Sequence, residues 1–139
     1  MIVLDTNVVS ALMRPDMNPA INSWLDRQEP SAIWTTAVSV LEVRSGILLL
    51  SDGRRKTGLL DSFDSFLRTI IVSRILPFDR NAAEAAATIS ARRIAVGRNI
   101  DRMDTQIAGI VVSRHAAFAT RNVKDFSDLD IPLLNPWVD

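Results

Sequence analysis

Short and almost wholly apolar runs alternate along this chain with longer segments whose apolar residues recur every three or four positions. The short runs are typical of strands buried on both faces of a parallel sheet, and the longer segments are typical of helices that bury one face. We therefore expect strands at 1–4, 32–36, 74–79 and 117–121, with an edge segment at 131–137. Between them we expect helices at 6–14, 19–29, 37–50, 53–72, 81–96 and 101–115.

This alternation predicts one α/β domain spanning residues 1–139. Its expected architecture is a three-layer α/β/α sandwich around a central, mainly parallel sheet, and the 47% of hydrophobic residues fits a well-packed core. The first helix should be capped by Thr6 or Asn7 and broken at Pro15.

Composition narrows the chemistry that the domain can perform. There are 16 basic and 16 acidic residues, so any polyanion must be bound by locally clustered charge. The absence of Cys excludes disulfides and thiolate metal sites, and the single His115 is expected at the surface near a helix C-terminus. No apolar run is long enough to span a bilayer, and the first residues lack a basic leader. We expect a soluble, cytoplasmic protein with no membrane partner.

Acidic and amide side chains fall where a parallel sheet places its ligands. Asp5 ends the first strand, and Asn122 and Asp125 follow the strand at 117–121. Glu42 lies in an otherwise apolar helix, with small residues around it on the helix surface. Asp104 lies just inside the start of another helix, behind Asp101 as the expected N-cap.

Each acid taken singly has an ordinary structural explanation. Asp5 could cap a helix, Glu42 could be solvated, and Asp104 could face the helix dipole. If the three converge at ~5 Å, each pair repels by roughly 3 kcal/mol at an effective dielectric near 20. A bound divalent cation would relieve this repulsion, and oxygen ligands without Cys favour Mg²⁺, with Mn²⁺ as a substitute.

Four segments of the chain resemble the motifs of PIN-domain ribonucleases. They are, in order, "MIVLDTNVVSALMRP", "TAVSVLEVRSGI", "DRMDTQIAGI" and "FATRNVKDF". The resemblance runs over essentially the whole chain and is specific to the toxin component of VapBC toxin–antitoxin pairs and to FitB-type proteins. It implies a PIN-like fold and Mg²⁺-dependent endonucleolytic cleavage of RNA, inhibited by a cognate small DNA-binding antitoxin.

The resemblance also assigns roles to individual residues. The family's catalytic positions match Asp5, Glu42, Asp104 and Asn122, of which the three acids would be the metal ligands. Thr6 and Thr120 would hold the carboxylates in place. Many relatives carry Asp where this chain has Asn122, so one negative charge fewer is available for a second metal. Asp125 would be the replacement acid if its loop turned inward, although a solvated Asp125 is the simpler expectation.

Substrate contacts would have to come from basic residues near the acidic motifs. The candidates nearest in sequence are Arg44, Arg102, Arg121 and Lys124. The basic run at 54–56 is more simply explained as a solvated turn or helix start. The apolar residues of the segment 47–71 exceed what one small core needs, which suggests a homodimer, a dimer of dimers or an antitoxin groove.

Two other functions remain open. A FitB-like subunit could act mainly as a repressor in a DNA-bound antitoxin complex, with weak or no nuclease activity and with the DNA contacts made by the partner. A carboxylate–Mg²⁺ phosphatase of the haloacid dehalogenase type is a weaker alternative, because its second Asp would stand where this chain has Asn7.

Overall fold

A computed structural model describes residues 1–14, 16 and 18–139, so Pro15 and its expected helix-breaking role lie outside the described residues. The sheet has five strands in the order β3-β2-β1-β4-β5, and every neighbouring pair is parallel. The strands are β1 (Ile2–Leu4), β2 (Ile33–Thr36), β3 (Ile75–Leu76), β4 (Ala117–Ala119) and β5 (Leu133–Leu134). The expected parallel α/β sheet is confirmed.

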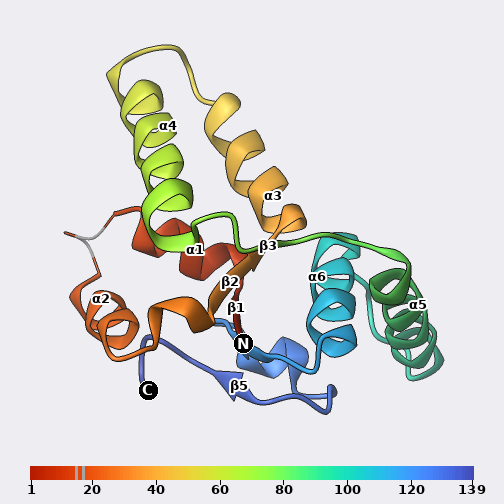
Figure 1. Ribbon diagram of the computed structural model, residues 1–139. Helices are drawn as coiled ribbons and strands as arrows, with labels where there is room; N and C mark the ends of the chain where they lie inside the picture. Colours follow the sequence, from red (N-terminus) through yellow and green to blue (C-terminus); the bar gives the residue numbers. More distant parts are fainter. Residues whose placement is uncertain (15, 17) are drawn as a thin grey trace.

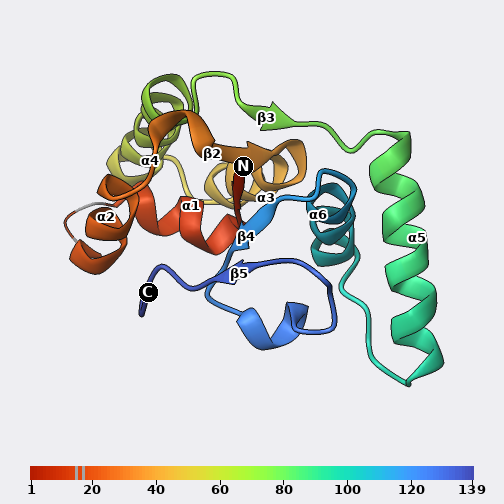
Figure 2. The same ribbon diagram turned by 60° about the horizontal axis from the view of Figure 1, so that its bottom comes forward.

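Helices cover both faces of this sheet (Figures 1 and 2). They are α1 (Thr6–Leu12), α2 (Pro19–Asp26), α3 (Ala37–Leu48), α4 (Arg54–Phe66), α5 (Arg80–Ala95) and α6 (Arg102–Ser113). Helix α3 lies between two groups, since it packs against α1 and α4 on one side and against α6 on the other. None of the described helices combines the length and the apolar character needed to cross a membrane.

The alternation of side chains along β1 divides the interior into two cores. Leu4 belongs to the core under α1, α2 and α4, whereas Val3 belongs to the core under α5 and α6. Gly109 of α6 lets α5 approach closely, because a Cβ at this position would lie 2.7 Å from Cβ of Ala86. The three-layer arrangement therefore rests on two separately packed faces of one sheet.

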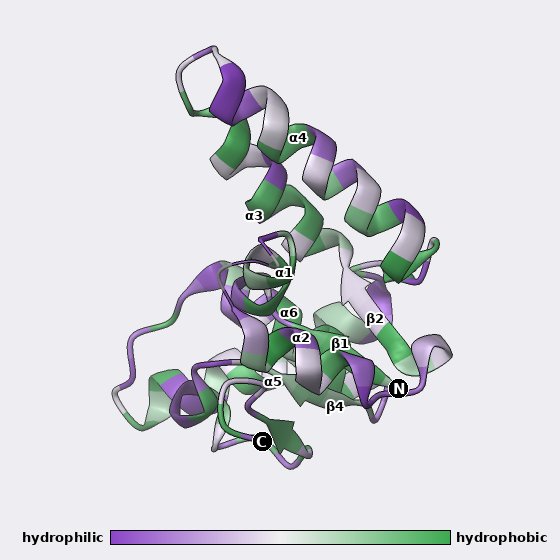
Figure 3. Ribbon diagram, turned by 90° about the vertical axis from the view of Figure 1, so that its left-hand side faces the viewer, coloured by the Kyte–Doolittle hydropathy of each residue, from purple (hydrophilic) through white to green (hydrophobic). Residues whose placement is uncertain are grey.

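Helices α3 and α4 project from the rest of the molecule as a hairpin (Figures 1 and 3). The expected single helix at 53–72 is instead α4 followed by the wider turn η3 (Leu67–Ile71), which ends at Val72 with a positive φ of 50°. Leu48 and Leu49 at the end of α3 are exposed, in line with the apolar surplus expected from the sequence. His115 is exposed just beyond α6, as predicted.

Candidate active site

The carboxylate of Asp5 occupies the carboxyl end of β1 and is only 4% exposed. Asp5 itself is the N-cap of α1, so the expected cap at Thr6 or Asn7 is wrong by one or two residues. Its Oδ1 accepts a 2.8 Å hydrogen bond from the Thr6 backbone N–H, and its Oδ2 accepts a 2.7 Å bond from the Thr120 hydroxyl. These donors fix the carboxylate across the end of the sheet, where ligands of parallel sheets bind.

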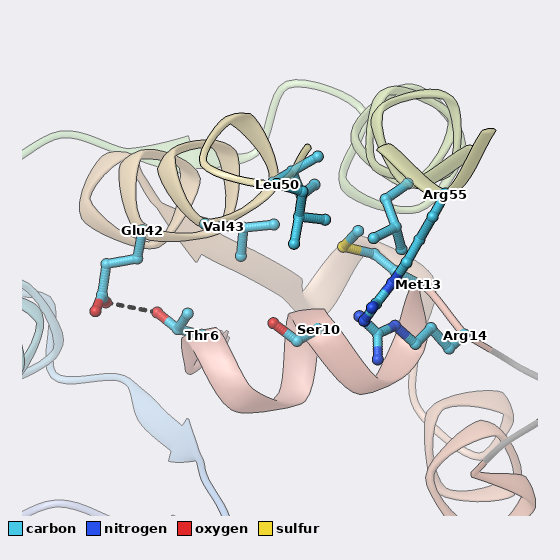
Figure 4. Close-up of a pocket in the computed structure, with 11 residues that line it drawn as sticks. Thr6, Ser10, Met13, Arg14, Glu42, Val43, Leu50 and Arg55 are labelled. Carbon is cyan, nitrogen blue, oxygen red and sulfur yellow. Dashed lines mark hydrogen bonds between the residues drawn. The ribbon is translucent and has the colours of Figure 1, made fainter. Parts of the chain in front are cut away.

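Glu42 reaches the same end of the sheet from α3. The Thr6 hydroxyl donates a 2.7 Å hydrogen bond to Oε1 of Glu42 (Figure 4). The same hydroxyl lies 2.9 Å from Oγ of Ser39. Ser39 is buried, and its backbone N–H is bound by the side chain of Thr36, the N-cap of α3. The first turn of α1 and the first half of α3 are thus joined through one hydroxyl, which holds Glu42 beside Asp5.

Asp104 enters from the first turn of α6 and is partly buried. As expected, Asp101 is the N-cap of α6, and its Oδ1 accepts from the Asp104 backbone N–H at 2.9 Å. Burial, followed in importance by the charges of Asp101, Asp5, Glu42 and Asp125, raises the pKa of Asp104 to about 6. The carboxylates from three separate parts of the chain therefore interact electrostatically.

Burial also raises the pKa of Asp5, against the lowering effect of the Thr120 and Thr6 hydrogen bonds, and the charge of Glu42 adds to the rise. In the described part of the chain, no ion pair involves Asp5, Glu42 or Asp104. The donors around them are neutral hydroxyl and amide groups. A set of hard oxygen donors with uncompensated charge fits a cation such as Mg²⁺ or Mn²⁺.

The described residues contain no group of three acidic or histidine side chains placed closely enough to hold a metal ion in this arrangement. The structure brings Asp5, Glu42 and Asp104 to one edge of the sheet and couples them, but it does not close a ligand shell. Their assignment as metal ligands and catalytic residues stays a prediction.

The segment after β4 frames the other side of Asp5. Thr120 is fully buried, and its Oγ1 accepts from the Asn122 backbone N–H at 3.1 Å. Asn122 is exposed at the start of the short helix η4 (Val123–Phe126), a turn that the hydrophobic pattern did not predict. Asp125 is also exposed, as the simpler expectation had it, and among the charges that raise the pKa of Asp104 its effect is the smallest.

The basic residues proposed as substrate contacts differ in how they are held. Arg44 donates a 2.6 Å hydrogen bond to Asp64 and stacks over the ring of Phe63 at 4.8 Å. The guanidinium of Arg121 lies 5.0 Å from the centre of the Trp137 ring. Arg102 and Lys124 are exposed. Their role in substrate binding stays a prediction, and Arg44 is the one whose charge is already matched by an acid.

Two polar residues that hold the site were not among the site residues predicted from the sequence. Asn7 donates from Nδ2 to Oδ2 of Asp5 at 3.4 Å and accepts from the Arg121 backbone N–H at 3.3 Å, so it ties α1 to the segment after β4. Ser39 lies next to the Thr6 hydroxyl, as described above. The available signals were the place of Asn7 two residues after Asp5 and that of Ser39 one turn before Glu42.

Comparison with known proteins points to one family. The chain matches the PIN domain family model over residues 2–132. It is 34% identical over 139 residues to toxin FitB of Neisseria gonorrhoeae, covering 100% of both chains. It is 31% identical over 137 residues to the VapC ribonuclease Y4jK of Sinorhizobium fredii, covering 99% of this chain and 98% of the relative.

A solved structure of FitAB bound to an IR36 DNA fragment superposes on the fold with a TM-score of 0.87. The sequence identity is 34%, and the match covers 99% of this chain and 96% of the other. The parallel sheet, the acids at its carboxyl edge and these similarities together show that the chain belongs to the PIN-domain family.

Proposed function

We propose that this protein is an Mg²⁺-dependent endoribonuclease, the toxin of a type II toxin–antitoxin pair that a cognate antitoxin inhibits in the cytoplasm. The observation that carries the proposal is the coupling of Asp5, Glu42 and Asp104 at the carboxyl edge of the sheet without a basic partner among the described residues. The VapC ribonuclease and FitB toxin among its relatives support the same activity.

In this proposal Asp5 and Asp104 are the principal metal ligands, and Glu42 is the third ligand or orients the attacking water. The chemistry that Mg²⁺ supplies in such a site is polarisation of the phosphodiester and a lowered pKa of bound water. Asp5 is held rigid by Thr120 and by the first turn of α1, so its carboxylate keeps one orientation.

The remaining roles follow from position. The Thr6 hydroxyl fixes one oxygen of Glu42, which leaves the other free to accept a proton from water. Asn122 is exposed beside this edge and could donate its side-chain amide to a phosphate oxygen without adding negative charge. Substitution of Asn122 by Asp would add a carboxylate at the same edge.

The test measures cleavage of single-stranded RNA by the purified chain in Mg²⁺, in Mn²⁺ and in EDTA. We expect cleavage in both metals and none in EDTA, restored when Mg²⁺ is returned in excess. Calorimetric titration with Mn²⁺ should show binding to the wild-type chain and to the Asp61→Asn control on the exposed face of α4, but weaker binding to Asp104→Asn. Cleavage that persists in EDTA would remove the metal from the proposal.

A second function is carried by a separate observation. The net charge is +0, and a FitAB complex with a very similar fold is bound to DNA. A chain of this kind could act as a homodimer or dimer of dimers in an antitoxin complex that represses an operator, with the DNA contacts made by the antitoxin. Gel-shift assays with operator DNA separate the two functions. Repression without cleavage would favour the second function, and DNA binding by the chain alone would contradict the assignment of these contacts to the partner.

A further inference from the structure

A pocket of about 210 Å³ adjoins the acidic site between α1, α3 and α4. Thr6 and Glu42 line one end of it, so the pocket is continuous with the edge of the sheet where Asp5 lies. Arg14, just beyond α1, and Arg55, in the first turn of α4, line the other end. Figure 4 shows the two arginine side chains running toward each other from opposite walls.

Neither arginine has an acidic partner in the part of the chain that the structure describes. Among the described residues, no ion pair or side-chain hydrogen bond involves Arg14 or Arg55, and both are exposed. Arg44 on the adjoining α3 is different, because Asp64 of α4 already neutralises it. Two guanidinium groups that face one pocket without a counter-charge favour an anion between them, and their planar donor forks match the oxygens of a phosphate.

The middle of the pocket is apolar. Met13, Val43 and Ile47 are buried in its wall, and Leu50 also lines it. Figure 4 shows Met13 beside the two arginines. An apolar wall beside two cations fits a nucleotide, whose base or ribose packs on carbon while its phosphate is held by the arginines.

We propose that this pocket binds a nucleotide of single-stranded RNA next to the phosphodiester that is cleaved, with Arg14 and Arg55 holding its phosphate. The inference rests on the proposed ribonuclease function and adds the direction in which the strand leaves the acidic site, along α1 toward the first turn of α4. The basic run at 54–56 is the helix start that the sequence offered beside a solvated turn, since α4 begins at Arg54. The inference adds a substrate contact for Arg55, because the first turn of α4 faces α1 across the pocket.

The test measures RNA binding separately from cleavage. Fluorescence anisotropy of an end-labelled oligonucleotide in EDTA gives the dissociation constant of the uncleaved strand as a function of salt. We expect Arg14→Gln and Arg55→Gln each to weaken binding roughly tenfold and to lower the salt slope by about 0.7, the effect of one phosphate contact on a single strand. Arg54→Gln is the matched control, since it removes the same charge one residue away and does not line the pocket.

The outcomes distinguish this inference from the proposed function. If Arg54→Gln and Arg55→Gln weaken binding equally, general charge and not the pocket binds the strand, and the inference is overturned while Mg²⁺-dependent cleavage stands. If both pocket variants keep wild-type RNA affinity but lose affinity for an antitoxin, the pocket takes a protein and the inference is again overturned. If RNA binding depends on the arginines but no metal supports cleavage, the ribonuclease proposal fails and the binding site remains.

Discussion

The acids at the carboxyl edge of the sheet and the ion-paired cluster of Arg93, Arg98 and Asp128 are built in opposite ways. Asp104 and Asp128 are the same residue type, yet the pKa of Asp104 is raised to about 6 and that of Asp128 is lowered to about 2. Asp128 owes its shift first to the hydrogen bonds from Arg93, which is 4% exposed, and then to Arg98. Asp104 is surrounded by other carboxylates and has no such partner among the described residues.

The ion pair between Arg93 and Asp128 has a structural role. Arg93 binds both oxygens of Asp128 at 2.9 and 3.0 Å, and it donates to the backbone carbonyl of Asp125 at 2.9 Å. It therefore fastens η4 to α5 and fixes the segment that carries Asn122. The acids at the sheet edge raise one another's pKa, and in the proposed function a bound cation balances their charge. The ion-paired cluster holds the frame of the site, and the acids at the sheet edge are the residues of the proposed chemistry.

We expect the largest effect on activity when one of the acids at the sheet edge loses its charge. Asp5→Asn should lower RNA cleavage in Mg²⁺ on the order of 10²–10³-fold, because a fixed charge in a water-poor site is lost. Its free energy of unfolding should be equal to that of the wild type or higher, since burial and Glu42 both disfavour the charged carboxylate. Single-turnover cleavage and urea denaturation measure the two quantities. Full activity in Asp5→Asn would remove the carboxylate from the mechanism.

Removing a charge from the cluster of Arg93, Arg98 and Asp128 should instead destabilise the fold. Arg93→Met should lower the free energy of unfolding by about 2–3 kcal/mol, because it leaves Asp128 and the Asp125 carbonyl without their donor. We do not expect a larger loss of stability, because the Asp128 side chain is 34% exposed and water screens part of the interaction. Arg80→Met is the control on the same helix, where an exposed 3.8 Å pair with Glu84 should contribute almost nothing. Equal losses in the two variants would mean that burial does not distinguish these pairs.

The hydrophobic pattern predicted the order of the strands and helices along the chain, because each buries a regular apolar face. It also placed Asp5 at the end of a strand, Asp104 near the start of a helix and Glu42 inside one. It could not show which charges are paired. Arg44 meets Asp64 twenty positions away in the sequence, and Arg93 meets Asp128 across thirty-five. Such pairs depend on how helices pack, and the spacing of residues along the chain carries no signal of it. The turn η4 was missed because its few residues lack a period.

The two clusters should also differ in how they change stability with pH, and Asp104 is the test for the acids at the sheet edge. Its pKa in the folded state is about 6, above the ordinary 3.8, so the folded chain binds this proton more tightly than the unfolded chain. Wild-type stability should therefore fall as pH rises from about 4 to 6, and Asp104→Asn should lack this fall. The variant should gain on the order of 1–2 kcal/mol relative to wild type between pH 4 and 7, allowing for solvent screening. A constant difference across that range would contradict the raised pKa.

Asp128 should give the smallest effect, with the opposite sign. Its pKa in the folded state is about 2, below 3.8, so its contribution is fully present above pH 3.8 and is lost as the pH falls toward 2. Asp128→Asn should be less stable than wild type at pH 6 by about 1 kcal/mol or less, because the side chain is partly exposed, and the deficit should shrink on acidification. Urea denaturation of both variants from pH 2 to 7 gives the two curves. The difference in stability between variant and wild type should change with pH in opposite directions for Asp104→Asn and Asp128→Asn. A change in the same direction would mean that the ion-paired carboxylate and the carboxylate without a basic partner do not differ, and the distinction between the two clusters would be wrong.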